Sequence, residues 1–142
     1  MQSNLMVSDV MTSQLKTVSI NQTLSAVKEI FEHHIFRHLP VMDGAKLVGI
    51  ISHTDFEKIL LGTKLAYEDS QFNQQSILSR ITAEQAMTRN PFTVPPDTPL
   101  EEVSEIFSKD VFHAIPIVDH GELVGIVTNH DLLKHLLDYD PR

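Results

Sequence analysis

Two short segments share one hydroxyl–carboxylate spacing, Ser52-His53-Thr54-Asp55 and Thr128-Asn129-His130-Asp131. A Ser or Thr followed three residues later by an acidic residue is typical of a helix start, where the side chains accept hydrogen bonds from backbone amides. The same groups suit a polar ligand, because a carboxylate accepts hydrogen bonds from two vicinal hydroxyls, as acidic residues do with ribose. Capping is the default interpretation of one such segment, and one Asp could do both.

A second pair of segments carries basic groups at the mouth of an apolar run, Phe36-Arg37-His38-Leu39-Pro40 and Phe112-His113-Ala114-Ile115-Pro116. Arginine binds phosphate through two parallel hydrogen bonds, so this placement suits an anion. Each basic residue taken singly is better explained as a solvated side chain. The recurrence beside the Ser/Thr-x-x-Asp spacing favours a binding site.

Other site chemistry finds no support. The eight histidines show no paired metal-ligand spacing, and the chain has no cysteine, which excludes a thiol nucleophile, a thiolate zinc site, an iron–sulfur cluster and a disulfide. No Walker loop, Rossmann glycine pattern or GxSxG elbow is present. We therefore expect neither a metal site nor an enzyme.

The composition of the chain argues against two kinds of partner, nucleic acid and membranes. Eleven Lys and Arg against 19 Asp and Glu give a net charge of −8 over 142 residues, which argues against general nucleic-acid binding. The apolar runs are far shorter than a membrane span, and residues 1–12 lack the features of a signal peptide. A cytoplasmic protein without membrane contact is expected.

The chain repeats itself. A shift of 76 positions places Met11–Leu61 on Met87–Leu137 without a gap, and 20 of the 51 pairs are identical. Such a match indicates one supersecondary unit used twice. Each copy predicts a short strand (Thr17-Val18 and Thr93-Val94), an amphipathic helix, a hairpin and a closing helix (Asp55–Leu61 and Asp131–Leu137).

The order β-α-β-β-α, twice, predicts a mixed α+β fold. In the second copy Thr98 is expected to cap the first helix, with Pro99 in the first turn and Glu101 completing a capping box. Residues 62–81 are polar and are expected to form a loop with partial helix.

The repeat resembles a tandem pair of CBS (cystathionine β-synthase) domains, the Bateman module. The resemblance covers residues 5–61 and 82–138, leaving 62–81 as a linker. It rests on the openings VMTSQLKTVSINQTL and AMTRNPFTVPPDTPL, the centres RHLPVMDGAKLVGIIS and HAIPIVDHGELVGIVT, and the closing SHTD and NHD.

The resemblance implies a non-catalytic regulatory module for energy sensing, whose repeats pack about a pseudo-twofold axis and leave two clefts. Members bind AMP, ADP, ATP or S-adenosylmethionine as regulatory ligands and require no cofactor. Carried over by position, one cleft would use Ile50, Ser52 and Asp55 with Phe92, Phe112, His113 and Ala114. The other would use Ile126, Thr128 and Asp131 with Lys16, Phe36, Arg37 and His38.

The two clefts are not expected to be equal. The second copy has Ala114 where the first has His38, so phosphate would meet fewer basic groups beside it. This difference predicts tighter binding of phosphorylated ligands in the cleft that holds Asp131 and Arg37.

The resemblance also implies a homodimer and an unidentified regulated protein. The candidate dimer contacts lie on the closing helices: Phe56, Ile59, Leu60, Leu132, Leu133 and Leu136. A ligand-free dimerisation or scaffold module is the alternative, and a metal-dependent hydrolase is the weakest hypothesis.

Overall fold

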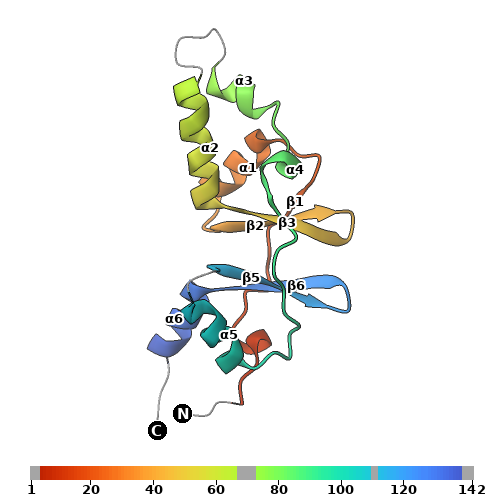
Figure 1. Cartoon of the computed structure of the whole chain (residues 1–142), viewed down its shortest axis with the longest axis vertical. Helices are drawn as coiled ribbons and strands as arrows, with labels where there is room; N and C mark the ends of the chain where they lie inside the picture. Colours follow the sequence, from red (N-terminus) through yellow and green to blue (C-terminus); the bar gives the residue numbers. More distant parts are fainter. Residues whose placement is uncertain (1–3, 67–72, 110–111, 139–142) are drawn as a thin grey trace. The chain divides into compact units, whose positions relative to one another are not determined.

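The computed structural model describes residues 4–66, 73–109 and 112–138. The chain forms two compact units that interleave along the sequence (Figure 1). The middle unit is Lys16–Pro91, and the terminal unit joins Met1–Leu15 to Phe92–Arg142. Each unit has its own buried cluster, so each is described separately.

The middle unit places helices on one face of a four-stranded sheet (Figure 1). The sheet order is β1-β2-β3-β4, with β1 parallel to β2 and the other pairs antiparallel. The strands are β1 (Val18–Ser19), β2 (His38–Asp43), β3 (Lys46–Ser52) and β4 (Thr88–Arg89). The helices are α1 (Leu24–His33), α2 (His53–Ala66), α3 (Gln74–Leu78) and α4 (Ala83–Ala86).

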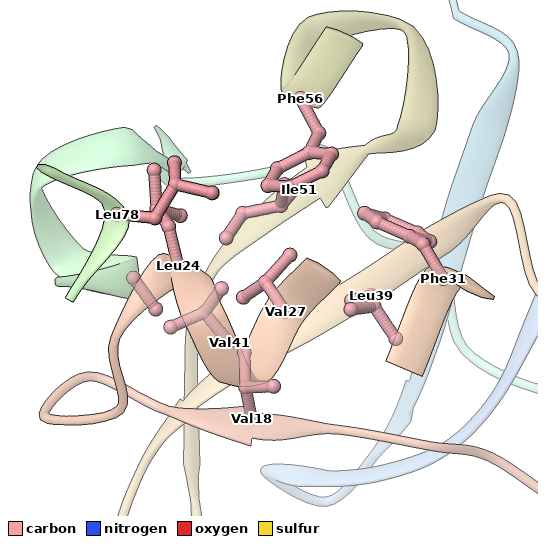
Figure 2. Packing of buried hydrophobic residues seen from close by; sticks show 10 residues of the cluster. Val18, Leu24, Val27, Phe31, Leu39, Val41, Ile51, Phe56 and Leu78 are labelled. Atoms are coloured by element: carbon pink, nitrogen blue, oxygen red, sulfur yellow. The ribbon is translucent and has the colours of Figure 1, made fainter. Parts of the chain in front are cut away.

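The core of the middle unit lies between its helices and the β2–β3 hairpin. Figure 2 shows Val27 and Phe31 of α1 above Leu39 and Val41 of β2, with Ile51 at the end of β3. Apolar residues of α1 recur at helical spacing and those of the strands alternate, so both elements turn an apolar face inward. This core fixes the end of β3, where α2 begins.

The terminal unit contains the second hairpin and its helices. Its elements are the 3₁₀ turn η1 (Val7–Asp9), α5 (Leu100–Ser108), β5 (Ala114–Asp119), β6 (Glu122–Thr128) and α6 (Asn129–Leu137). The two predicted hairpins and all four predicted helices are therefore present. Their closing helices begin at His53 and Asn129, two residues earlier than expected.

The short strand expected at Thr93-Val94 is reduced to a single parallel bridge between Val94 and Ile117. The reason is visible in the first copy, where the Ile20 amide donates to the Met42 carbonyl over 3.0 Å and extends the ladder. The equivalent position 76 residues later is Pro96, which has no amide hydrogen to donate. The prediction of a second strand was wrong for that reason.

The segments that lead into the repeats are exchanged between them. The Leu100 amide donates to the Leu5 carbonyl over 3.0 Å. At the equivalent positions of the repeat, the Leu24 amide donates to the Ile81 carbonyl over 2.8 Å. Bridges repeat the pattern, Met6 with Pro99 and Thr23 with Thr82. Each compact unit is thus built from parts of both repeats, and the boundaries 5–61, 62–81 and 82–138 stay a prediction about the sequence repeat.

The exchanged segments close over glycines in the hairpins. A Cβ at Gly49 would overlap the Met87 side chain, and a Cβ at Gly125 would overlap that of Met11. These glycines and methionines are identical pairs of the repeat. Close approach, rather than backbone conformation, therefore explains glycine at both positions.

The expected cap of α5 is wrong. Pro99 occupies the N-cap position, so Thr98 stands one residue too early to reach the amides of the first turn. Its hydroxyl donates instead to the Pro95 carbonyl over 2.7 Å, inside the contact between residues 95–100 and the exchanged N-terminal segment. The segment 62–81 also contains more helix than expected, because α2 continues to Ala66 and α3 follows.

The apolar positions of the closing helices divide between core and surface. Phe56 is buried in the core and is therefore no surface position. Ile59, Leu60 and Leu132 are half-buried and pack against the cores. Leu133 and Leu136 are 57% and 68% exposed. A dimer contact through these helices stays a prediction.

Candidate functional site

Both Ser/Thr-x-x-Asp segments lie at a junction where a strand passes directly into a helix. Ser52 is the last residue of β3 and α2 begins at His53, while Thr128 ends β6 and α6 begins at Asn129. No loop separates strand and helix, so the hydroxyl and the carboxylate are held by regular elements at both sites. This confirms the predicted helix starts.

The basic segments lie beside these helix starts within the same unit. His38 pairs with Ser52 across the first hairpin, and the His53 amide donates to the Arg37 carbonyl over 2.7 Å. In the second hairpin Ala114 pairs with Thr128. The structure thus brings Arg37 and His38 next to Ser52, although the resemblance assigned them to different clefts. Which residues of the two repeats share a ligand stays a prediction.

Each oxygen of the Asp131 carboxylate accepts a hydrogen bond from its own unit. Its Oδ2 accepts from the Thr128 amide over 2.9 Å, while the Asp131 amide donates to Thr128 Oγ1 over 3.1 Å, which completes a capping box. Its Oδ1 accepts from the Thr12 hydroxyl over 3.3 Å. Both oxygens therefore have a protein partner.

The Asp55 carboxylate is in a different state. The Asp55 amide donates to Ser52 Oγ over 3.0 Å, which is half of a capping box. Within residues 4–66, 73–109 and 112–138 the carboxylate itself accepts no hydrogen bond and forms no ion pair, and Asp55 is exposed. This carboxylate is ready to accept two hydrogen bonds from a ligand.

A hollow of about 370 Å³ opens near this helix start. Apolar Phe31, Ile35 and Phe36 line it together with the nitrogen-bearing Arg37, His34 and His53. Its size lies within the range of small-molecule sites, about 300–1,000 Å³. Sequence reasoning named Phe36 and Arg37 but missed the other four, of which only His53 carried a signal, as the residue after Ser52.

Lys16 does not line the hollow that contains Arg37. It lines a second hollow of about 330 Å³ along α1, formed with Thr17, Gln22, Ala26, Glu29, Ile30, His33 and His34. The two hollows share only His34 among their lining residues. Lys16 and Arg37, which the resemblance assigned to one cleft, therefore line different hollows.

The His53 ring is held among three neighbours. Its Nδ1 lies 2.7 Å from Glu57 Oε1 on α2 and 3.3 Å from Arg37 Nη1. The edge of the ring meets Phe31 of α1 at a centroid distance of 5.1 Å and an interplanar angle of 85°. His53 thus connects the cation of the hollow to the closing helix.

In the terminal unit Phe92 and Phe112 stack on each other with centroids 5.1 Å apart and planes at 12°. An inserted aromatic ring would need about 7 Å between them, because stacked carbons approach to about 3.5 Å. Phe92 is 42% exposed, so a planar ligand would stack on its outer face. His113 is exposed beside them and Ala114 is half-buried.

The two isoleucines of the candidate site differ in burial. Ile50 is half-buried in β3 between Pro40 and Thr88, and Ile126 is buried in β6 opposite Pro116 and bridged to Thr12. Ile50 is therefore the more accessible of the two.

The described ranges contain neither a candidate metal site nor a candidate membrane span. No group of three His, Asp or Glu side chains there could hold a metal ion. None of the helices described is long and apolar enough to cross a membrane.

Comparison with known proteins identifies the repeat. The family model of the CBS domain matches residues 7–62 and 83–138. The protein MJ1225 of Methanocaldococcus jannaschii is 31% identical over 133 residues, which cover 93% of this chain and 47% of the relative. The chain thus spans about half the length of that relative.

Two solved structures share the fold and contain ligands. CBSX2 of Arabidopsis thaliana, in complex with AMP, matches with a TM-score of 0.75 and 25% identity over 93% of this chain and 96% of its own. The CBS domain pair of MJ0100, in complex with 5′-methylthioadenosine and S-adenosyl-L-methionine, matches with a TM-score of 0.73 and 30% identity, covering 94% and 97%. With two matched repeats and this fold, the chain belongs to the CBS domain family, as a tandem CBS domain pair.

Proposed function

We propose that this CBS pair is a non-catalytic regulatory module that binds an adenosine-containing ligand through its Ser/Thr-x-x-Asp helix starts. The observation that carries the proposal is the exposed Asp55 carboxylate, which has no partner in the described residues and stands beside the Ser52 hydroxyl. The complexes of CBSX2 with AMP and of MJ0100 with two adenosine compounds support the ligand class.

The chemistry of the helix start fits a ribose. A carboxylate accepts from two vicinal hydroxyls at once, which a ribose offers through its 2′ and 3′ positions. Arg37, next to the hollow that contains Phe36 and His53, supplies a cation for a phosphate. Phe92 offers an exposed ring face for an adenine. That residues from both repeats contact one ligand stays a prediction of the resemblance.

Regulation then follows from differential affinity. A ligand shifts the arrangement of a protein only as far as it binds one arrangement better than another. The module would need no cofactor and would report to a regulated protein, as a homodimer. Exposed Leu133 and Leu136 on α6 are the remaining dimer candidates.

A scaffold that binds no ligand is the second candidate. It is favoured by one observation, the complete capping box of Asp131, which shows that this motif can serve structure alone. The two candidates differ in a single measurable property, stabilisation by an adenosine compound.

The proposal is tested by a thermal-shift series with AMP, ADP, ATP, S-adenosylmethionine and 5′-methylthioadenosine, each at about 1 mM. At least one compound is expected to raise the melting temperature, and its 2′,3′-dideoxy analogue is expected to raise it much less, because it lacks the hydroxyls that Asp55 would bind. Asp55→Asn should remove the difference between the two compounds, whereas Asp43→Asn, at an exposed hairpin position of the same unit, should retain it. No stabilisation by any compound would favour the scaffold.

A further inference from the structure

One nitrogen of His53 faces two partners with opposite requirements. Its Nδ1 lies 2.7 Å from the Glu57 carboxylate, which only accepts hydrogen bonds, and 3.3 Å from the Arg37 guanidinium, which only donates them. A ring nitrogen either carries a hydrogen or offers a lone pair. It can therefore satisfy Glu57 or Arg37, but not both together.

The two distances describe one of these states. At 2.7 Å from a carboxylate the hydrogen must be on Nδ1, because two bare acceptors would repel at that distance. Arg37 is then left without an acceptor on the ring. In the other state the hydrogen is on Nε2 only, Nδ1 accepts from Arg37, and Glu57 turns away to water.

Protonation selects between the states. Imidazolium carries hydrogens on both nitrogens, so it must donate to Glu57 and it repels Arg37, whereas a neutral ring can accept from Arg37. The groups that face the ring are Arg37 before β2, Glu57 on α2, and Phe31 of α1, with His34 in the same hollow. The Glu57 side chain is 63% exposed, so its carboxylate can leave the His53 ring and form hydrogen bonds with water instead.

The arrangement belongs to one repeat only. At the positions 76 residues later the second copy has His113 for Arg37, Asn129 for His53 and Leu133 for Glu57. Asparagine does not titrate and leucine does not pair with a cation. The first copy therefore contains a titratable contact that the fold does not require.

We propose that His53 is a positioning residue that makes binding of an anionic ligand by Arg37 depend on protons. Protonated His53 pairs with Glu57 and leaves the guanidinium to a phosphate, while neutral His53 holds the guanidinium in a hydrogen bond. This rests on the proposed function, because the anion is the phosphate of an adenosine compound. Binding of a phosphorylated ligand takes up a proton at His53, and binding of uncharged adenosine does not.

The test is calorimetry with AMP and with adenosine at pH 6.0 and pH 8.0, on the unmodified chain and on His53→Asn. Because the phosphate of AMP itself titrates near pH 6, the comparison is the affinity ratio between the two proteins at each pH. The unmodified chain should bind AMP about as well as His53→Asn at pH 6.0, because the Arg37 guanidinium is free in both proteins. At pH 8.0 the unmodified chain should bind AMP about fivefold more weakly than His53→Asn, because neutral His53 holds the guanidinium away from the phosphate. Adenosine should show no such change.

Glu57→Gln and His120→Gln are the matched controls. Glu57→Gln removes the negative charge that draws the imidazolium away from Arg37 and should reduce the pH dependence. His120 lies in the hairpin of the other unit, and its substitution should leave the dependence intact. AMP binding with the same pH dependence in the unmodified chain and in His53→Asn would overturn the switch. Absence of all AMP binding would instead overturn the proposed function, and with it the link to a ligand.

A measurement without ligand tests the hydrogen bond between Arg37 and His53 independently of AMP binding. Nitrogen NMR of the His53 ring at pH 8.0 should show the hydrogen on Nε2, and Arg37→Met should move it toward Nδ1, because methionine has no N–H to donate to that nitrogen. A ring that keeps its hydrogen on Nδ1 in both proteins would contradict the proposal.

Discussion

Asp55 and Asp131 occupy equivalent positions of a repeat and have opposite surroundings. Asp131 accepts hydrogen bonds from the Thr128 amide and the Thr12 hydroxyl, whereas the Asp55 carboxylate has no partner among the residues described. Thr88 is the repeat equivalent of Thr12 and lies exposed in β4 without such a bond. The same motif therefore completes a helix start in one unit and leaves an acceptor for a ligand in the other.

This difference argues against one expectation, which stays a prediction. The charge of Arg37 and His38 predicts tighter binding of phosphorylated ligands at the site of Asp131, where a ligand must share the carboxylate with the Thr12 hydroxyl. The Asp55 carboxylate has no such protein donor among the residues described. We therefore expect Asp55 to contribute more to affinity and Asp131 more to stability.

The largest expected effect concerns a glycine–methionine contact that each unit contains in its own equivalent form. Gly49→Ala and Gly125→Ala should each lower the free energy of unfolding by about 1–3 kcal/mol, because the added methyl group overlaps Met87 or Met11. Urea unfolding measures the change. Gly62→Ala, in open space on α2, is the control without overlap and should raise the free energy of unfolding by about 0.5–1 kcal/mol, because alanine favours a helix interior. A harmless substitution at only one of the two glycines would show that the exchanged segments pack differently.

The two aspartates should separate in the same assay. Asp131→Asn is expected to cost about 1–2 kcal/mol, since it weakens a capping box and the bond from Thr12, while Asp55→Asn should cost about 0.5 kcal/mol from the helix dipole alone. Equal losses would mean that Asp55 has a structural partner after all.

The threonines test the origin of the difference. Thr12→Val keeps the shape of the side chain and removes the donor to Asp131, so it should cost about 0.5–1 kcal/mol. Thr88→Val should change stability by less, because its hydroxyl holds no carboxylate. A larger loss of stability for Thr88→Val than for Thr12→Val would contradict the idea that only Thr12 holds a carboxylate.

The smallest effect is expected at the second hairpin. His120 adopts φ +51° in the turn, a conformation that costs a residue with a Cβ and that Gly44 provides freely in the first hairpin. His120→Gly should therefore raise the free energy of unfolding by about 0.5 kcal/mol or leave it unchanged. A clear loss would mean that the ion pair with Asp119 outweighs the backbone conformation.

Much of the fold could be predicted from sequence, because apolar periodicity and turn residues report local structure directly. The helix starts at Ser52 and Thr128 and both hairpins follow from such patterns. The exchange of leading segments could not, since it depends on which of two equivalent hairpins a segment pairs with. The state of the two carboxylates depends on that exchange, because Thr12 reaches Asp131 through it.

The hollow beside Arg37 shows the same limit. Phe36 and Arg37 could be named from their place before β2, but Phe31 and His34 join them only once α1 packs on the hairpin. The contact of His53 with Glu57 is a helical i, i+4 pair and could have been found from spacing. Its competition with Arg37 requires the strand register that brings residues 37 and 53 together.

The most direct test of the central claim is calorimetric titration of AMP into the unmodified chain, Asp55→Asn and Asp131→Asn. We expect measurable binding that weakens about tenfold or more in Asp55→Asn, because hydrogen bonds to a charged acceptor are lost. Asp131→Asn should weaken binding by a smaller factor at a temperature where it is fully folded. Undiminished binding by Asp55→Asn would contradict the account.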